Sequence, residues 1–270
     1  RTIALDSGRV PERGAQQTGA WPWSGDAERG SYDHRGPWDG QKIEFFFTNR
    51  TGQELAATVW APSGRRLGEL GLSAPLPGVV YSPGVLSSQP MYYWFAQGMA
   101  EAGYVVMTYD VTGQGRSEGR STGDAPADLE DAIDFFVSTP SRRYPRRDEH
   151  SIDFNPLHGM LDRRRLGTAG HSMGAGAVQT VGDHGGVVKA ISAQSDLRAT
   201  YAHDVPIQGQ GADYESFIFP PQPSPGTDPD GKLAGFQAVR DRGVDVQEVV
   251  IESGSHMAWS HVTWAYTSVW

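Results

Sequence analysis

The stretch RLGTAGHSMGAGAVQTV, residues 165–181, decides how the rest of the chain is interpreted. Residues 166–170 are short and apolar, as in a buried strand, and residues 173–181 are suited to a helix. Ser172 stands between them in a G-x-S-x-G pattern. In a strand–turn–helix setting, this pattern is typical of a serine held on a sharp turn at the carboxyl end of its strand. We therefore predict that Ser172 is a nucleophile and that the Met173 amide, at the helix start, faces a developing oxyanion.

Short apolar segments alternate with helix-forming ones on both sides of this stretch. This alternation indicates an α/β fold with a mostly parallel central sheet flanked by helices. The turn at residues 49–52 adds an antiparallel hairpin, and residues 62–77 are expected to be a loop. The expected strands are residues 43–48, 55–60, 79–82, 104–109, 166–170, 187–193, 205–208 and 246–252, and the expected helices are residues 92–102, 127–138, 173–181, 233–242 and 258–270.

The 270 residues suffice for one large core, which predicts a single catalytic domain. Residues 1–40 are rich in glycine, tryptophan and charge without clear periodicity. We expect them to form an irregular N-terminal arm, and residues 41–270 to form the α/β domain. The chain begins at Arg1, and its basic residues are almost all arginine. These two features suggest a processed, secreted protein from a high-GC bacterium.

The composition excludes several classes of function. The chain has no cysteine, which rules out disulfides, thiolate metal sites and a cysteine nucleophile. Its net charge of −9 speaks against binding to nucleic acid or to an anionic membrane, and its apolar runs are too short to span a bilayer. Asp228 and Asp230 lack the spacing of an EF-hand. We therefore expect no metal, no cofactor, and no nucleic-acid or membrane partner.

Arginine clusters occur on either side of residue 155, and they are expected to be solvated surface paired with nearby acids. Their members are Arg142, Arg143, Arg146, Arg147, Arg163, Arg164 and Arg165.

A serine needs a base to remove its proton, so a histidine is required downstream. His256 follows the last expected strand, and a loop there would bring it over the sheet edge beside Ser172. His261 falls inside the expected terminal helix, where a surface or packing role is the default. The remaining candidates are His184 and His203.

The third member of such a site is a carboxylate that orients the imidazole. Asp213 follows the expected strand at residues 205–208, and it preserves the chain order Ser…Asp…His. Asp196 competes, because it follows the strand at residues 187–193. Asp196 and Asp204 are otherwise expected to be a helix cap and a solvated loop charge.

The second oxyanion donor is expected in the loop at residues 83–89, after the strand at residues 79–82. Gly84 permits a sharp bend there, so the Val85 amide is the expected donor and Leu86 is the alternative. The aromatic run at residues 92–95 lies close to this loop and is expected to belong in part to the core.

The chain resembles an α/β-hydrolase over roughly residues 40–270. The segments Ser82-Pro83-Gly84, Ala102-Gly103-Tyr104-Val105-Val106 and Gly170-His171-Ser172-Met173-Gly174 resemble those of secreted actinobacterial esterases of the bacterial cutinase and polyester-hydrolase type. This resemblance implies an oxyanion hole at Val85 and Met173, a triad acid at Asp213 and a histidine loop at Ser255-His256. Asp110 with the segment at residues 113–117 resembles the D-x-x-G-x-G-x-S loop of the fold.

Some features depart from that group. Val85 stands where those esterases usually carry an aromatic residue, and the C-terminal cysteine pair is absent. Dienelactone hydrolases are the second group that the layout resembles. The stretch at residues 194–205 is barely long enough for a crossover between parallel strands, so no large cap domain is expected there.

These inferences predict a serine hydrolase that cleaves a small or polymeric carboxylic ester through an acyl-enzyme. The expected catalytic residues are Ser172, His256 and Asp213, with the Val85 and Met173 amides as oxyanion hole. The alternatives are an amidase or peptidase on the same triad, and a non-catalytic binding module of the same fold.

Overall fold

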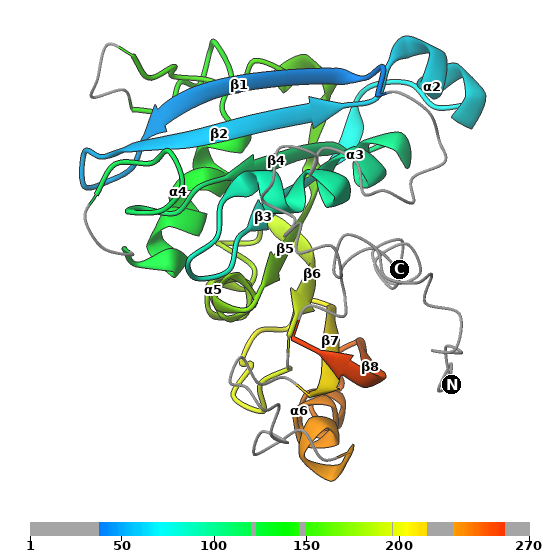
Figure 1. The fold of residues 1–270 in the computed structure, drawn as a ribbon. Helices are drawn as coiled ribbons and strands as arrows, with labels where there is room; N and C mark the ends of the chain where they lie inside the picture. The colour runs from blue at the N-terminus through cyan, green and yellow to red at the C-terminus, as the bar shows by residue number, and fades with distance from the viewer. Residues whose placement is uncertain (1–37, 120–122, 146–149, 196, 215–228, 257–270) are drawn as a thin grey trace.

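The structure is a computed structural model, and it describes residues 38–119, 123–145, 150–195, 197–214 and 229–256 (Figure 1). These residues form an eight-stranded sheet in the order β1-β2-β4-β3-β5-β6-β7-β8. β2 runs antiparallel to the strands on both sides of it, and the other neighbouring strands of this sheet, from β4 to β8, pair in parallel. The strands are β1 (Gln41–Thr48), β2 (Glu54–Ala61), β3 (Leu76–Ser82), β4 (Val105–Tyr109), β5 (Leu161–His171), β6 (Val188–Gln194), β7 (Ile207–Tyr214) and β8 (Val246–Ser255).

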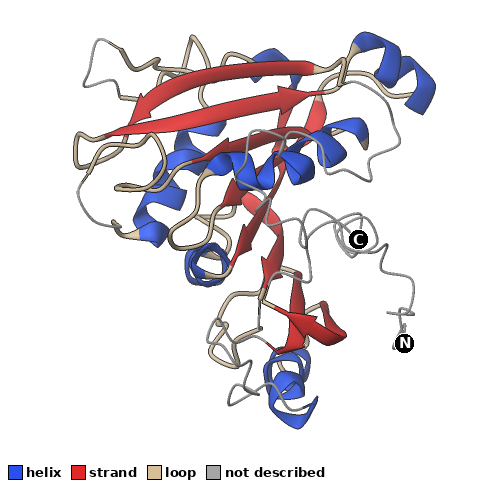
Figure 2. Ribbon diagram, in the orientation of Figure 1, coloured by secondary structure: helices blue, strands red, loops and turns tan. Residues whose placement is uncertain are grey.

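Helices cover both faces of the sheet, as Figure 2 shows. They are α2 (Gly64–Leu70), α3 (Tyr93–Glu101), α4 (Ala125–Phe136), α5 (Met173–Val181) and α6 (Pro229–Asp241), with short 3-10 turns η3 (Gln89–Tyr92) and η4 (His158–Met160). Strand residues alternate between the faces. Val79 and Tyr81 pack with α3 in one core cluster, whereas Val80 packs with α4 and α5 in the other. The mostly parallel sheet predicted from the sequence is therefore confirmed.

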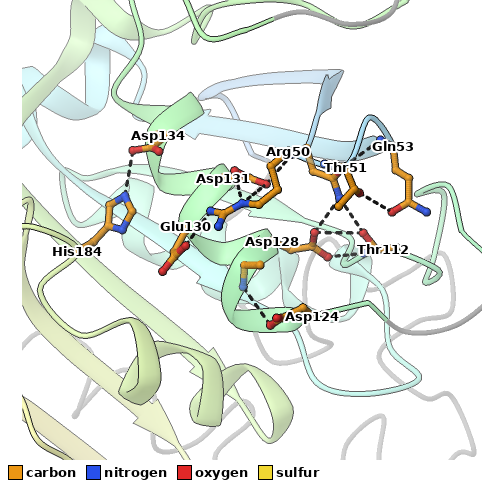
Figure 3. Close-up of polar contacts among 12 residues, drawn as sticks. Arg50, Thr51, Gln53, Thr112, Asp124, Asp128, Glu130, Asp131, Asp134 and His184 are labelled. Atoms are coloured by element: carbon orange, nitrogen blue, oxygen red, sulfur yellow. Dashed lines mark hydrogen bonds and ion pairs between the residues drawn. The ribbon is translucent and has the colours of Figure 1, made fainter.

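The acidic face of α4 holds the β1–β2 turn (Figure 3). The Arg50 side chain donates to Asp131 at 3.1 Å and to Glu130 at 2.7 Å. Asp128 accepts from the Asn49 side chain at 3.0 Å and from the Thr112 backbone N–H at 2.8 Å. Burial raises the pKa of Asp128, and these donors oppose that rise. The hairpin is thus fixed to α4 and to the loop after β4.

Three differences from the sequence prediction stand out among several shifted element boundaries. The expected loop at residues 62–77 contains α2, which is capped by the Ser63 side chain and ended by Gly71 at φ 65°. β5 begins at Leu161, five residues before the expected start. Its first part includes the exposed polar residues 163–165, which lack the apolar pattern of a buried strand. β7 runs on to Tyr214 rather than ending near residue 208, so that Asp213 lies inside the strand.

The chain between β6 and β7 contains no helix in its described part, residues 195 and 197–206. This agrees with the prediction that no cap domain is inserted there. No helix within the described ranges combines the length and apolar character needed to cross a membrane.

Three members of the arginine clusters, Arg143, Arg164 and Arg165, pair with nearby acids, as expected. Arg165 contacts Asp162 at 2.9 Å, and Arg143 contacts Asp153 at 2.6 Å. Arg146 and Arg147 lie outside the described residues, as do residues 1–37, residues 215–228 with Asp228, and the expected helix at residues 258–270.

Candidate active site

The sheet topology indicates a binding site at the carboxyl ends of the strands, between β3 and β5. β3 and β5 are neighbouring parallel strands, with Ser82 directly opposite Gly170. The helix that follows β3 lies on one face of the sheet and the helix that follows β5 lies on the other. In open α/β sheets, ligands bind outside the carboxyl ends of the strands where the connections diverge in this way. The residues after β3 and β5 therefore border the expected site.

Ser172 stands at this point, between the end of β5 and the first residue of α5. Its backbone adopts φ 55° and ψ −113°, a conformation that L-residues rarely adopt. Its N–H donates to the carbonyl of Gln194 at the end of β6, at 3.1 Å. Strained backbone of this kind is concentrated at functional sites. The sharp turn predicted from the G-x-S-x-G pattern is confirmed.

The two glycines of the pattern are required by close backbone contacts. A Cβ on Gly174 would stand 2.1 Å from the carbonyl oxygen of Ser82, and one on Gly170 would stand 2.4 Å from the carbonyl oxygen of Gly174. The first turn of α5 therefore lies directly against the end of β3. This packing brings the loop after β3 to the nucleophile: a Cβ on Gly84 would be 3.4 Å from the Cβ of Ser172.

That loop carries two apolar side chains in the open. Val85 is 45 % exposed and Leu86 is 88 % exposed, and Leu86 has φ 55°. The Leu86 N–H donates to the side-chain oxygen of Gln114, so it is already engaged within the protein. Of the two donors considered from the sequence, this favours Val85. Met173 is the first residue of α5, where helix N–H groups point away from the helix.

His171, directly before Ser172, joins the site's loops through a buried hydrogen-bond chain. Its Nε2 lies 3.3 Å from the carbonyl oxygen of His256, and its Nδ1 lies 3.0 Å from the hydroxyl of Tyr92. A carbonyl can only accept, so Nε2 carries the proton and Nδ1 accepts from Tyr92. The Gly84 N–H in turn donates to the Tyr92 oxygen at 2.9 Å. The chain thus connects the histidine loop with the loop after β3.

The protonation states in this chain are set by burial. Burial and the neighbouring His256 hold the pKa of His171 well below its usual range, so its ring is neutral near pH 7. Burial raises the pKa of Tyr92 to about 12, so that its hydroxyl remains a donor. The aromatic run at residues 92–95, which was expected to belong in part to the core, is buried at all four side chains.

His256 lies at the same sheet edge as Ser172. It directly follows β8, it is 8 % exposed, and its ring centroid is 4.7 Å from that of His171, the residue adjacent to Ser172. The expected position of His256 over the sheet edge agrees with this geometry.

Asp213 lies in the backbone of β7 at a register shift. Ala212 pairs with Ile251 and Tyr214 pairs with Ser255, so three residues of β8 face the single residue Asp213. Irregular strand pairing of this kind is over-represented next to active sites. The pairing of Tyr214 with Ser255 brings the backbones of Asp213 and His256 together.

The other candidates are engaged elsewhere or lie outside the described residues. His184 pairs with Asp134 at 2.9 Å (Figure 3), and His203 lies 3.1 Å from the carbonyl oxygen of Thr180. Asp204 is 94 % exposed and pairs with Arg242, which fits the solvated loop charge expected of it. Asp196 and His261 fall outside the described residues. Within the described ranges, no group of three or more His, Asp or Glu side chains is arranged to hold a metal ion.

Sequence reasoning did not assign a role to His171, Tyr92 or Gln114. All three occur in segments that the sequence singled out, but their hydrogen bonds reach residues far away in the chain: Tyr92 bonds His171, and Gln114 bonds Leu86. His171 directly precedes Ser172, but the G-x-S-x-G pattern leaves its position free, so the pattern gave no sign of its role.

His171 predicts a loss of stability in acid. In the unfolded chain the pKa of His171 returns to about 6.5. Below that pH the unfolded state therefore binds a proton at His171 that the folded state does not bind. The free energy of unfolding should therefore fall as the pH drops below about 6.5, by up to about 1.4 kcal/mol per pH unit from this group. Urea unfolding at pH 7.5, 6.5 and 5.5 should show a shallower fall for His171→Asn than for the wild type. Equal pH slopes in the two proteins would contradict the prediction.

Comparison with known proteins agrees with this geometry. A family model described as PETase, PET hydrolase-like, matches residues 58–206, which is more than half of the chain and includes Val85, Ser172 and Met173. A sequence comparison with curated proteins gave no match.

Solved structures show the same fold at low sequence identity. An esterase of Pyrococcus furiosus superposes with a TM-score of 0.61 at 13 % identity, covering 87 % of this chain and 92 % of the esterase. A Klebsiella pneumoniae protein described as a dienelactone hydrolase gives 0.56 at 16 % identity, covering 80 % and 87 %. An acylaminoacyl peptidase of Pyrococcus horikoshii gives 0.56 at 14 % identity, covering 82 % of this chain and 38 % of the peptidase. At these identities the likeness establishes the fold, and the chemistry must be argued from the residues.

Proposed function

Because the chain belongs to the PET hydrolase-like family of α/β hydrolases, we propose that it is a serine esterase that cleaves carboxylic esters through an acyl-enzyme. The observation that carries the proposal is the strained backbone of Ser172 on the β5–α5 turn. The ring of His256 packs against His171, the residue directly before Ser172. A nucleophile on a sharp turn, next to a histidine, is the arrangement that acyl transfer requires.

The proposed reaction has two steps. The Ser172 oxygen attacks the ester carbonyl carbon while His256 takes the serine proton, and Asp213 stabilises the imidazolium. The carbonyl oxygen becomes negative and accepts from the Val85 and Met173 amides. The tetrahedral adduct collapses, the ester C–O bond breaks, and the alcohol leaves with the proton from His256. Water then attacks the acyl-enzyme by the same route, which releases the acid and restores Ser172.

The exposed side chains of Val85 and Leu86 support an apolar acyl group as the substrate. They follow Gly84, where an added Cβ would stand 3.4 Å from the Cβ of Ser172, and they present apolar surface to water. An apolar acyl group lying against them would remove this surface from water. We therefore propose that short and medium apolar esters, including units of a polyester, are better substrates than charged ones.

A substrate series tests the proposed function. We expect the protein to hydrolyse p-nitrophenyl esters, with kcat/KM rising by roughly three- to fourfold for each added acyl CH₂ until the acyl group outgrows the contact, since each buried CH₂ contributes about 0.8 kcal/mol. The matched p-nitroanilides should be cleaved more slowly. Efficient cleavage of the anilides would instead favour an amidase or peptidase, and no turnover of any member would favour a binding module.

A further inference from the structure

One buried glutamine side chain binds both peptide groups that flank Val85. Gln114 is 6 % exposed, and its Nε2 donates to the carbonyl oxygen of Gly84 at 3.2 Å. Its Oε1 accepts from the N–H of Leu86. The donor and the acceptor of one planar amide therefore hold the chain immediately before and immediately after Val85. Two bonds from one rigid group fix the orientation of the segment as well as its position.

Gln114 is itself held firmly, in the loop after β4. The buried carboxylate of Asp110 accepts from the Arg116 N–H at 2.9 Å, and the Asp110 carbonyl accepts from the Ser117 hydroxyl at 2.6 Å. Gly115 has φ 54°, and a Cβ there would stand 2.3 Å from the Asp110 carboxylate. The Gln114 N–H donates to the Val111 carbonyl at 3.0 Å. The loop can therefore act as a fixed support for the Gln114 side chain.

The segment that Gln114 holds would not keep its conformation by side-chain packing. Leu86 has φ 55°, a left-handed conformation that is strained for a non-glycine residue, and its side chain is 88 % exposed. The hydrogen bond from the Leu86 N–H to Gln114, in the loop after β4, therefore helps to hold Leu86 in its strained conformation. On the other side, the Gly84 N–H donates to Tyr92.

We propose that Gln114 is a positioning residue that presets the Val85 N–H for the oxyanion. The inference rests on the proposed function, and it adds a residue that never touches the substrate. A preset donor stabilises charge that develops only in the transition state, so its misplacement should lower kcat and leave KM nearly unchanged. A shift of about 1 Å in such a group can cost roughly 10²-fold in rate.

The test compares three variants. Gln114→Met keeps the volume and removes both hydrogen bonds, whereas Gln114→Glu keeps an acceptor for Leu86 and removes the donor to Gly84. Gln179→Met is the matched control, because Gln179 is also buried and also bridges two backbone groups, the Ala175 carbonyl at 3.1 Å and the Arg198 N–H at 2.8 Å. These contacts lie along α5 and away from Val85.

We expect Gln114→Met to lower kcat for p-nitrophenyl butyrate about 10–100-fold with KM within about twofold. Gln114→Glu should lower kcat at least as much, because a carboxylate oxygen would then lie against the Gly84 carbonyl oxygen. The rate of covalent labelling by a fluorophosphonate should fall in parallel, because its adduct also places an oxygen in the hole. Gln179→Met should lower Tm and keep kcat. A folded Gln114→Met protein with wild-type kcat, or an equal loss of kcat in Gln179→Met, would overturn the proposal. A wild-type protein that neither turns over esters nor is labelled would overturn both this proposal and the proposed function.

Discussion

Replacing Ser172 by alanine should lower kcat for ester hydrolysis by about 10⁴–10⁶-fold and abolish covalent labelling by a fluorophosphonate. The acyl-enzyme cannot form without the serine oxygen, and what remains is the stabilisation supplied by the oxyanion hole and by binding. The fold should persist, since the β5–α5 turn is held by backbone contacts of Gly170 and Gly174 rather than by the serine side chain. Kinetics with p-nitrophenyl butyrate, mass spectrometry of the labelled protein and a thermal melt check the three parts.

His256 provides the partner to this experiment. Residues that act as one unit in catalysis are strongly non-additive, so His256→Ala should cost nearly as much as Ser172→Ala, and the double variant should lose little more. His203→Ala is the matched control, because His203 contacts the Thr180 carbonyl and lies outside the proposed machinery. Ser192→Ala, a half-buried serine of β6, controls for the labelling. Labelling of the Ser172 variant at the wild-type rate would show that another residue is the nucleophile.

Elements with a local signal at both ends could be predicted well. The helix at residues 173–181 matches α5 in both bounds, because the turn at Ser172 starts it and Gly182, at φ 60°, ends it. The helix before Gly103 was predicted from that glycine, which has φ 98°. The β1–β2 hairpin follows from its turn and its alternating side chains.

Elements that depend on tertiary contacts could not be predicted in the same way. α2 buries none of its residues, so it has no apolar periodicity, and only Ser63 and Gly71 mark its ends. The middle of β7, residues 208–211, is rich in glutamine and glycine, which are poor strand residues. It is a strand because β6 and β8 pair with it on either side and because Gln210 donates to Gln208 at 2.6 Å.

The same division applies to the site. The residues next to Ser172 in the sequence predict its position. The choice of Val85 rather than Leu86 as the proposed oxyanion donor depends instead on the Gln114 side chain, 28 residues away from Leu86. The link from Tyr92 through His171 to the His256 carbonyl spans 164 positions, from residue 92 to residue 256. Contacts over such separations leave no pattern in a single sequence. They become visible only when the fold brings the strand ends together.

Replacing Gly174 by alanine should have the second large effect, and the reason is steric. The new Cβ would stand 2.1 Å from the Ser82 carbonyl oxygen and 2.7 Å from that of Pro83, and both atoms belong to backbone at the buried end of β3. The backbone cannot yield there without moving α5 away from β3, which shifts the Met173 amide and separates Ser172 from Gly84. We expect a loss of about 3 kcal/mol or more in the free energy of unfolding, a drop in Tm of roughly 6–12 °C, and a fall in kcat of at least about 10²-fold.

Two other glycines provide matched controls for this substitution. A Cβ on Gly176, also in α5, would meet the guanidinium of Arg198, the far end of a flexible and exposed side chain that can move aside. A Cβ on Gly68, in α2, would meet nothing within 4 Å, so Gly68→Ala should gain up to about 1 kcal/mol from helix propensity. We therefore expect Gly68→Ala to be the most stable of the three variants and Gly174→Ala the least stable, with Gly176→Ala between them. Only Gly174→Ala should have a reduced kcat. If Gly174→Ala had the same Tm and kcat as Gly176→Ala, the added methyl group would be harmless at both positions. The close contact between α5 and β3 would then not be what fixes the turn at Ser172.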